Sequence, residues 1–212
     1  MLIKAFFIFL FFSLPAKAHT FTTMIGFYDG LSHPVLGLDH FIAMISVGII
    51  SAQIKGKAIW LVPLTFVLMM IIGGILGMMN EFNSSYDTQV VALNQINIYS
   101  TDFLYRAIEI GIILSVILLG LVILIDKKMS IKITIFFICI FGLCHGAAHG
   151  IEMPWASNPI LFGLGFSVGT ATLHLFGVGI GFYFMKKKLS SLLLRFLGLC
   201  FVICGVYFFI NI

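Results

Sequence analysis

Two histidines and a glutamate interrupt an otherwise apolar stretch of the sequence between Phe141 and Pro154. On a helix, at about 100° per residue, His149 lies about 40° around the axis from His145, and Glu152 lies about 20° to the other side. The three side chains therefore project from one narrow helix face. Placing ionisable groups in a helix that is apolar enough to cross a membrane costs free energy. A helix face that carries three of them therefore indicates a functional site.

A second group of ionisable residues has the sequence His33-Pro-Val-Leu-Gly-Leu-Asp-His40. His33 and His40 are seven residues apart, so they share a helix face if the helix runs regularly between them. Pro34 suits the first turn of that helix, where its missing N–H costs nothing. Asp39 points about 100° away from His40, where it either orients an imidazole or lines a pore on its own.

Three further residues are candidates that also have plainer explanations. Glu109 binds a metal or, equally well, pairs with Arg106 three residues earlier on the same helix. His174 stands alone in its apolar stretch, and a lone histidine in a helix is more often a packing residue than a ligand. His19 follows an expected cleavage site, so its amine and its imidazole would form a chelating pair at the mature N-terminus.

The composition predicts the kind of element that positions these residues. Hydrophobic residues make up 61% of the 212 positions and charged residues 9%, whereas about a quarter of a soluble domain is charged. The chain is therefore expected to be an all-α integral membrane protein in a lipid bilayer. The net charge of +4 does not indicate nucleic-acid binding, because no basic face accompanies it. The four cysteines lie in apolar stretches without a CxxC motif, which predicts free thiols.

The first 18 residues read as a secretory signal, with Lys4, an apolar core and an Ala16-Lys-Ala18 cleavage site. Residues 19–212 then form a single domain, a six-helix transmembrane bundle. Each apolar stretch is long enough to span about 30 Å of hydrocarbon. The helices are expected near 34–54, 59–79, 103–125, 132–150, 159–185 and 189–210, with a polar external loop at 80–102 that has room for a short surface helix.

Lysines in alternate loops predict the orientation in the membrane. They occupy the loops around Lys55, Lys128 and Lys187, whereas the other loops carry acidic residues and no lysine. This pattern agrees with cleavage of the signal, and it places both mature termini outside the cytoplasm, in a bacterial inner membrane. His174 then lies deeper than the other candidates. The outer half of the bundle gathers His19, His33, Asp39, His40, Glu109, His145, His149 and Glu152.

Imidazole with carboxylate is the ligand set of borderline divalent metals such as nickel, cobalt and zinc. A shallow cluster with one deeper histidine therefore suggests capture of an ion at the outer mouth and passage inward. Glycines at helical spacing predict where helices pack closely, within one chain or between copies in a homo-oligomer. They are Gly142, Gly146 and Gly150, with the segments 73–77 and 165–169.

At these residues the sequence resembles the HupE/UreJ family of bacterial nickel and cobalt permeases. The similarity covers nearly the whole mature chain in order, and the two histidine motifs are specific. It is carried by His33-Pro-x-x-Gly-x-Asp39-His40, Trp60-x-x-Pro63, Gly73-Gly74-x-x-Gly77, Glu109-x-Gly-Ile-x-x-Ser115, His145-Gly-x-Ala-His149-Gly-x-Glu152 and Ala171-Thr-x-x-His174.

The resemblance implies a small secondary permease with a cleaved signal and six membrane helices. Its matched histidines, with Asp39 and Glu152, would form the path of Ni²⁺ or Co²⁺, with Zn²⁺ not excluded. The ion is cargo, so no permanently bound cofactor and no enzymatic activity are expected. The loop at 80–102 is longer and more polar than the family leads us to expect.

Two other classes of protein fit the same residues. A membrane haem protein would need two histidines facing each other from different helices, such as His40 and His174. An intramembrane zinc hydrolase would use His145, His149 and Glu152 as ligands. However, Gly146 occupies the position after the first histidine where the HExxH motif of zinc proteases has its glutamate, and Ala147 and Ala148 are no substitute for it.

Overall fold

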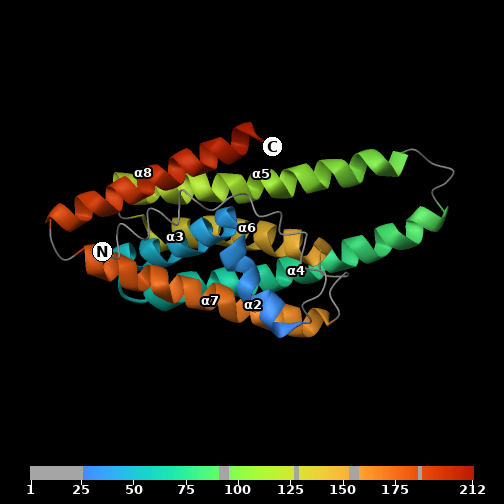
Figure 1. The fold of residues 1–212 in the computed structure, drawn as a ribbon, viewed down its shortest axis with the longest axis horizontal. Coiled ribbons are helices and arrows are strands. Elements are labelled where there is room, and N and C mark those ends of the chain that lie inside the picture. Colours follow the sequence, from blue (N-terminus) through green and yellow to red (C-terminus); the bar gives the residue numbers. More distant parts are fainter. Residues whose placement is uncertain (1–25, 91–95, 127–128, 153–157, 186–187) are drawn as a thin grey trace.

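The computed structural model describes residues 26–90, 96–126, 129–152, 158–185 and 188–212 (Figure 1). The expected signal peptide and His19 lie outside these residues. The described elements are all helices, with no strand among them, which agrees with the predicted all-α class. They are α2 (Phe27–Leu36), α3 (Leu38–Ile54), α4 (Ala58–Val90), α5 (Ile96–Ile125), α6 (Ile131–Glu152), α7 (Pro159–Phe184) and α8 (Lys188–Ile210).

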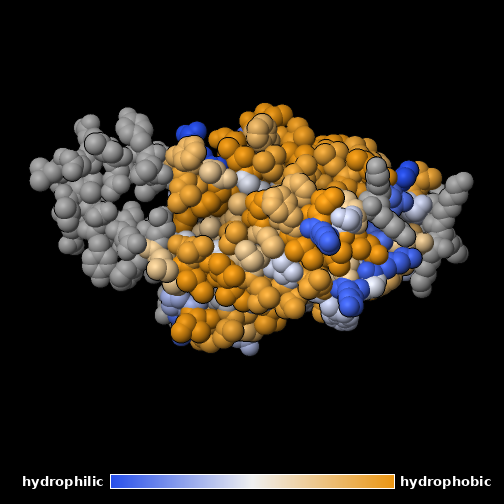
Figure 2. Space-filling model, turned by 180° about the vertical axis from the view of Figure 1, so that it is seen from behind, coloured by the Kyte–Doolittle hydropathy of each residue, from blue (hydrophilic) through white to orange (hydrophobic). Residues whose placement is uncertain are grey.

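Among the described helices, five are long and apolar enough to cross a membrane, and a sixth span results if α2 and α3 count as one. One face of the molecule is almost continuously hydrophobic, and its hydrophilic residues gather mainly at one end (Figure 2). Large apolar side chains, among them Leu64, Phe136 and Phe196, are exposed on the outside of the helix bundle. Exposed apolar bulk of this extent fits a lipid environment, so the molecule is a multi-span membrane protein.

α3 is the central element of the bundle. It packs against α4, α5 and α7, and it also touches α6 and α8. All residues from Ile42 to Gln53 are buried, so the helix has no lipid-facing side. This burial accommodates its polar side chains Ser46, Ser51 and Gln53, which would be costly in contact with lipid.

The first helix of the bundle is bent, which corrects the expectation of one helix near 34–54. α2 ends at Leu36, α3 begins at Leu38, and their axes differ by 85°. Gly37 between them is extended, with φ −81° and ψ 112°, and its N–H donates to the carbonyl of His33. Pro34 accordingly lies inside the last turns of α2 and not in the first turn of a long helix.

The polar stretch at 80–102 is a second correction, because it is largely helical. α4 continues to Val90 and α5 begins at Ile96, so both helices extend beyond the rest of the bundle at one end (Figure 1). The stretch contains no glycine and no proline. Polar residues alone do not end a helix, whereas glycine and proline commonly do.

Glycines allow two helix pairs to pack backbone against backbone, as the sequence predicted. α6 lies along α4, and α2 lies along α7. A Cβ atom added to Gly146 would collide with the carbonyl of Met70, and one added to Gly165 would collide with the carbonyl of Phe27. These close contacts fix α6 and α2, which carry three of the histidines, against their neighbours α4 and α7.

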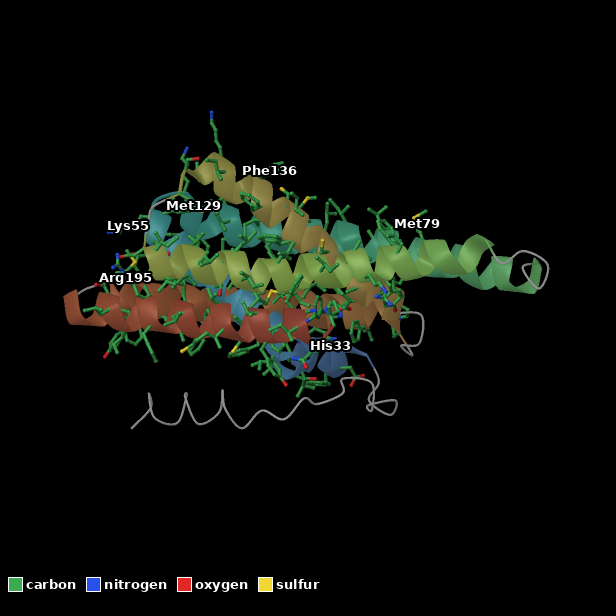
Figure 3. The ribbon with its side chains drawn as sticks, turned by 90° about the horizontal axis from the view of Figure 1, so that it is seen from above. His33, Lys55, Met79, Met129, Phe136 and Arg195 are labelled. Atoms are coloured by element: carbon green, nitrogen blue, oxygen red, sulfur yellow. The ribbon has the colours of Figure 1, made fainter. Side chains whose placement is uncertain are left out.

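A polar contact joins three helices at the end of the bundle remote from this packing. Gln53 of α3 donates to the carboxylate of Asp126, which follows α5, at 3.1 Å. The Arg195 guanidinium of α8 lies 3.8 Å from the same carboxylate. Lys55, Met129 and Arg195 lie at this end, and Met79 lies towards the other (Figure 3).

Candidate metal site

Four histidines from three helices meet inside the bundle; we call them the histidine cluster. His33 comes from α2, His40 from α3, and His145 and His149 from α6. The ring centroids are 4.5 Å apart for His40 and His149, 4.6 Å for His33 and His149, and 4.9 Å for His40 and His145. Figure 3 shows His33 away from the end of the bundle that carries Lys55 and Arg195.

The bend at Gly37 brings the two halves of the cluster together. His33 lies in the last turn of α2 and His40 in the first turn of α3, so both flank the bend. Their ring centroids are 6.5 Å apart. His145 and His149 are one turn apart on α6, as predicted, and their face points at the bend.

Asp39 orients the imidazole of His40. Its Oδ1 lies 2.9 Å from the Nδ1 of His40. An ionised carboxylate can only accept hydrogen bonds, so Nδ1 carries a proton and donates it. Of the two roles predicted for Asp39, the structure supports orientation of the ring. In metal sites, a carboxylate in this position directs the opposite nitrogen, Nε2, toward the ion.

The backbone of α6 orients the imidazole of His145 through Nδ1, as Asp39 does for His40. Its Nδ1 lies 2.8 Å from the carbonyl oxygen of Phe141, which can only accept. In neutral His145 the lone pair is therefore on Nε2. This nitrogen is buried and has no hydrogen-bond partner among the described residues. A buried nitrogen left in this state calls for an explanation, and an ion that binds there transiently supplies one.

Aromatic rings pack against the histidine cluster, and two of its histidines are almost fully buried. His145 and His149 are 0% and 3% exposed. The ring of Phe166 on α7 lies 4.3 Å from that of His149 and 5.9 Å from that of His33, centroid to centroid. On the other side, the ring of Phe66 on α4 lies 5.4 Å from that of His145.

The histidine rings contact one another in edge-to-face or tilted arrangements, without converging on one point. Among the described side chains, no three His, Cys, Asp or Glu groups are arranged to hold one ion at once. The histidine cluster is thus not a closed metal centre. It is a set of imidazoles, most of them buried, whose rings would have to shift in order to coordinate one ion together.

The remaining predicted residues are placed as follows. His174 lies outside the histidine cluster, fully buried on α7, and the ring of Phe66 separates it from His145. Glu109 lies on α5, partly exposed, and its part in the pathway stays a prediction. Glu152 is the last residue of α6, two residues beyond the expected helix 132–150, and its side chain lies outside the described part of the structure.

The sequence prediction missed two kinds of residue at the site. Phe66 and Phe166 were not among the predicted site residues, yet their rings pack against its histidines. Asp29 lies one turn before His33 on α2, and both of its carboxylate oxygens are buried without a hydrogen-bond partner among the described residues. The four-residue spacing between Asp29 and His33 was the signal in the sequence that could have identified it.

A groove opens beside the site between α4, α6 and α7. Its volume is about 390 Å³, and His149 and Phe166 form part of its inner wall. Ile75, Ile160 and Leu164 on its rim are exposed at the molecular surface. The groove therefore connects the surroundings of the transmembrane bundle with the edge of the histidine cluster.

An all-helical membrane protein with a buried cluster of histidines and an aspartate is the class that the fold and the site define. The sequence matches the family model described as HupE / UreJ protein over residues 7–97 and 90–208. It is 34% identical over 170 residues to Protein HupE of Rhizobium leguminosarum bv. viciae, which covers 79% of this chain and 78% of that protein. No solved structure matches the chain. The chain belongs to the HupE/UreJ family.

Proposed function

We propose that this protein is a permease that takes up divalent nickel or cobalt across the bacterial inner membrane. The observation that carries the proposal is the meeting of four imidazoles from three helices inside an apolar bundle, with Asp39 behind one of them. Such a cluster is costly in a membrane protein unless it binds something. Membership of the HupE/UreJ family favours nickel or cobalt as the ion.

The histidine cluster suits capture better than permanent storage of an ion. Its rings contact one another, so an ion enters by separating them and leaves as they close again. His33 and His149 form one contact of the cluster, and His40 and His145 form another. An ion passed along these pairs moves toward His145, beyond which lie Phe66 and His174.

The contacts within the histidine cluster disfavour haem binding between those histidines. A porphyrin must fit between its two axial imidazoles, and the centroids of His40 and His149 are 4.5 Å apart. The zinc hydrolase alternative lacks a general base at Gly146, where the HExxH motif has its glutamate. Neither alternative is supported by a specific contact in the structure.

Accumulation of radioactive nickel tests the proposal, with cobalt and zinc as competing ions. Cells that make the wild type are compared with cells that make His40→Ala or His145→Ala, at matched amounts of protein in the membrane. We expect both substitutions to abolish accumulation. Thr172→Ala is the control, because Thr172 is exposed on α7 and its hydroxyl bonds only to the Val168 carbonyl of its own helix. Wild-type accumulation no greater than in cells lacking the protein would refute uptake.

A further inference from the structure

One phenyl ring contacts both the histidine cluster and His174. Phe66 of α4 is fully buried. Its ring centroid is 5.4 Å from that of His145 and 5.2 Å from that of His174. The two imidazoles come from α6 and α7, so Phe66 bridges three helices at this depth of the bundle.

The histidines on both sides of this ring have nitrogen atoms that the described protein leaves unbonded. Nε2 of His145 is one of them, and both ring nitrogens of His174 are the others. Buried polar atoms of this kind are rare and call for a ligand that the folded chain does not itself supply. Two such imidazoles on either side of an apolar ring form two binding positions and a barrier between them.

The backbone of α4 packs closely against α6 at Phe66. The carbonyl of Phe66 faces Gly142 of α6, where an added Cβ would come within 2.9 Å of it. Pro63, three residues earlier, lacks the N–H that would bond to the preceding turn, so α4 is locally weakened there. Rotation of the phenyl ring is therefore the smallest movement that opens a path between His145 and His174.

We propose that Phe66 is the gate of the ion path, and that its ring must swing aside each time an ion passes from His145 to His174. The inference rests on the proposed function, since a gate has meaning only where an ion moves. It assigns Phe66 control over the rate of passage, while the histidine cluster determines capture. His174 is then the first position that the ion reaches on the inner side of the gate.

Downhill movement of nickel in proteoliposomes tests this assignment. The full-length chain is reconstituted as wild type, Phe66→Ala, Phe66→Leu and Phe66→Trp, and initial rates are measured under a nickel gradient. We expect Phe66→Ala to raise the rate about tenfold, Phe66→Leu to raise it less, and Phe66→Trp to lower it. Equilibrium binding of nickel to each purified variant is measured alongside, so that rates are compared at equal occupancy of the histidine cluster. A purely structural role could not produce transport faster than that of the wild type.

Phe201→Ala is the matched control. Phe201 is also fully buried, but it lies on α8 in the apolar core, where its Cβ faces Gly120 of α5. We expect this variant to retain the wild-type rate when equal amounts of folded protein are compared.

The outcomes separate the gate from the proposed function. A wild type that moves nickel, with rates unchanged across the Phe66 series, overturns the gate alone. A wild type that moves no nickel overturns the permease, and the gate with it. If Phe66→Ala does not fold, Phe66→Leu and Phe66→Trp decide: opposite shifts in rate support the gate, and equal rates overturn it.

Discussion

Two imidazoles of the site are fixed through one nitrogen each. In His40 the partner of Nδ1 is a carboxylate, and in His145 it is a backbone carbonyl one turn earlier on the same helix. Both arrangements direct Nε2 into the site. The carboxylate differs in that its negative charge also strengthens the ring as a ligand. Asp39 is therefore the residue through which affinity for an ion is most readily altered without removing a ligand.

Replacing Asp39 by Ala should lower the affinity for nickel by about 10-fold to 100-fold. The substitution removes the acceptor that holds the His40 ring, while His33, His145 and His149 remain. Isothermal titration of the purified protein with nickel measures the effect. Asp126→Ala is the control, because Asp126 lies at the Gln53–Arg195 contact and not at the histidine cluster. Equal affinities for the two variants would contradict the role given to Asp39.

Binding of nickel should weaken as the pH falls below about 6, because protonation removes the lone pair through which an imidazole binds a metal. Binding to the purified wild type, followed from about pH 7.5 to about pH 5, provides the test. An affinity that stays constant over this range would show that histidines are not the ligands.

At this scale the sequence identified the histidines and Asp39 but not the aromatic walls. Ionisable residues stand out in an apolar chain, so their types and spacing were sufficient. Phe66 is one of 23 phenylalanines, and nothing in its local sequence distinguishes it. Its contacts with His145 and His174 depend on how α4, α6 and α7 pack together.

Among the elements, the bend between α2 and α3 has the strongest effect on the site. A regular helix would have carried His33 and His40 two turns apart on one side. The bend instead places His33 near the end of α2 and His40 near the start of α3, on either side of Gly37. An added Cβ on Gly37 would lie 3.1 Å from Nδ1 of His40 and 3.2 Å from Oδ1 of Asp39. The absence of a side chain there leaves room for the hydrogen-bonded pair.

Gly37→Ala should therefore weaken nickel binding while leaving the fold intact. The backbone at this position, with φ −81°, accepts alanine, so the main consequence is displacement of Asp39 and His40. We expect a loss of affinity comparable to that of Asp39→Ala, measured in the same titration. Gly179→Ala is the matched control, because an added Cβ there meets nothing within 4 Å. Unchanged binding in Gly37→Ala would mean that the pair adapts to the extra methyl group.

The sequence predicted the straight helices well and the bent one poorly. Four of the expected starts, at 59, 132, 159 and 189, lie within one residue of those observed for α4, α6, α7 and α8. Long apolar stretches bounded by basic or polar residues are sufficient for this. The bend was missed because the stretch from Phe27 to Ser32 mixes polar and apolar residues, and Gly37 lies within a stretch that otherwise continues as a helix.

For the molecule as a whole, the distribution of charge predicts its orientation. Basic residues lie near the end formed by Lys55 and Arg195 (Figure 3), and His33 lies away from that end. The rule that lysine and arginine gather on the cytoplasmic side then places the histidine cluster nearer the outer face.

A fusion of alkaline phosphatase to the C-terminus should therefore be active, because this enzyme folds only outside the cytoplasm. A fusion in the connection between α5 and α6, after Asp126, should be inactive. Enzyme activity normalised to the amount of fusion protein gives the readout. The reverse pattern would place the histidine cluster on the cytoplasmic side and would turn the proposed uptake into export.

The groove between α4, α6 and α7 leaves part of the surroundings of His149 to the solvent outside the protein. In a bilayer that solvent is hydrocarbon, which cannot hydrate an ion or an imidazole. In a detergent micelle, water penetrates more readily and raises the local dielectric constant. The same polypeptide should therefore bind nickel with a different affinity in lipid nanodiscs and in detergent, because the medium that fills the groove sets the dielectric constant beside His149.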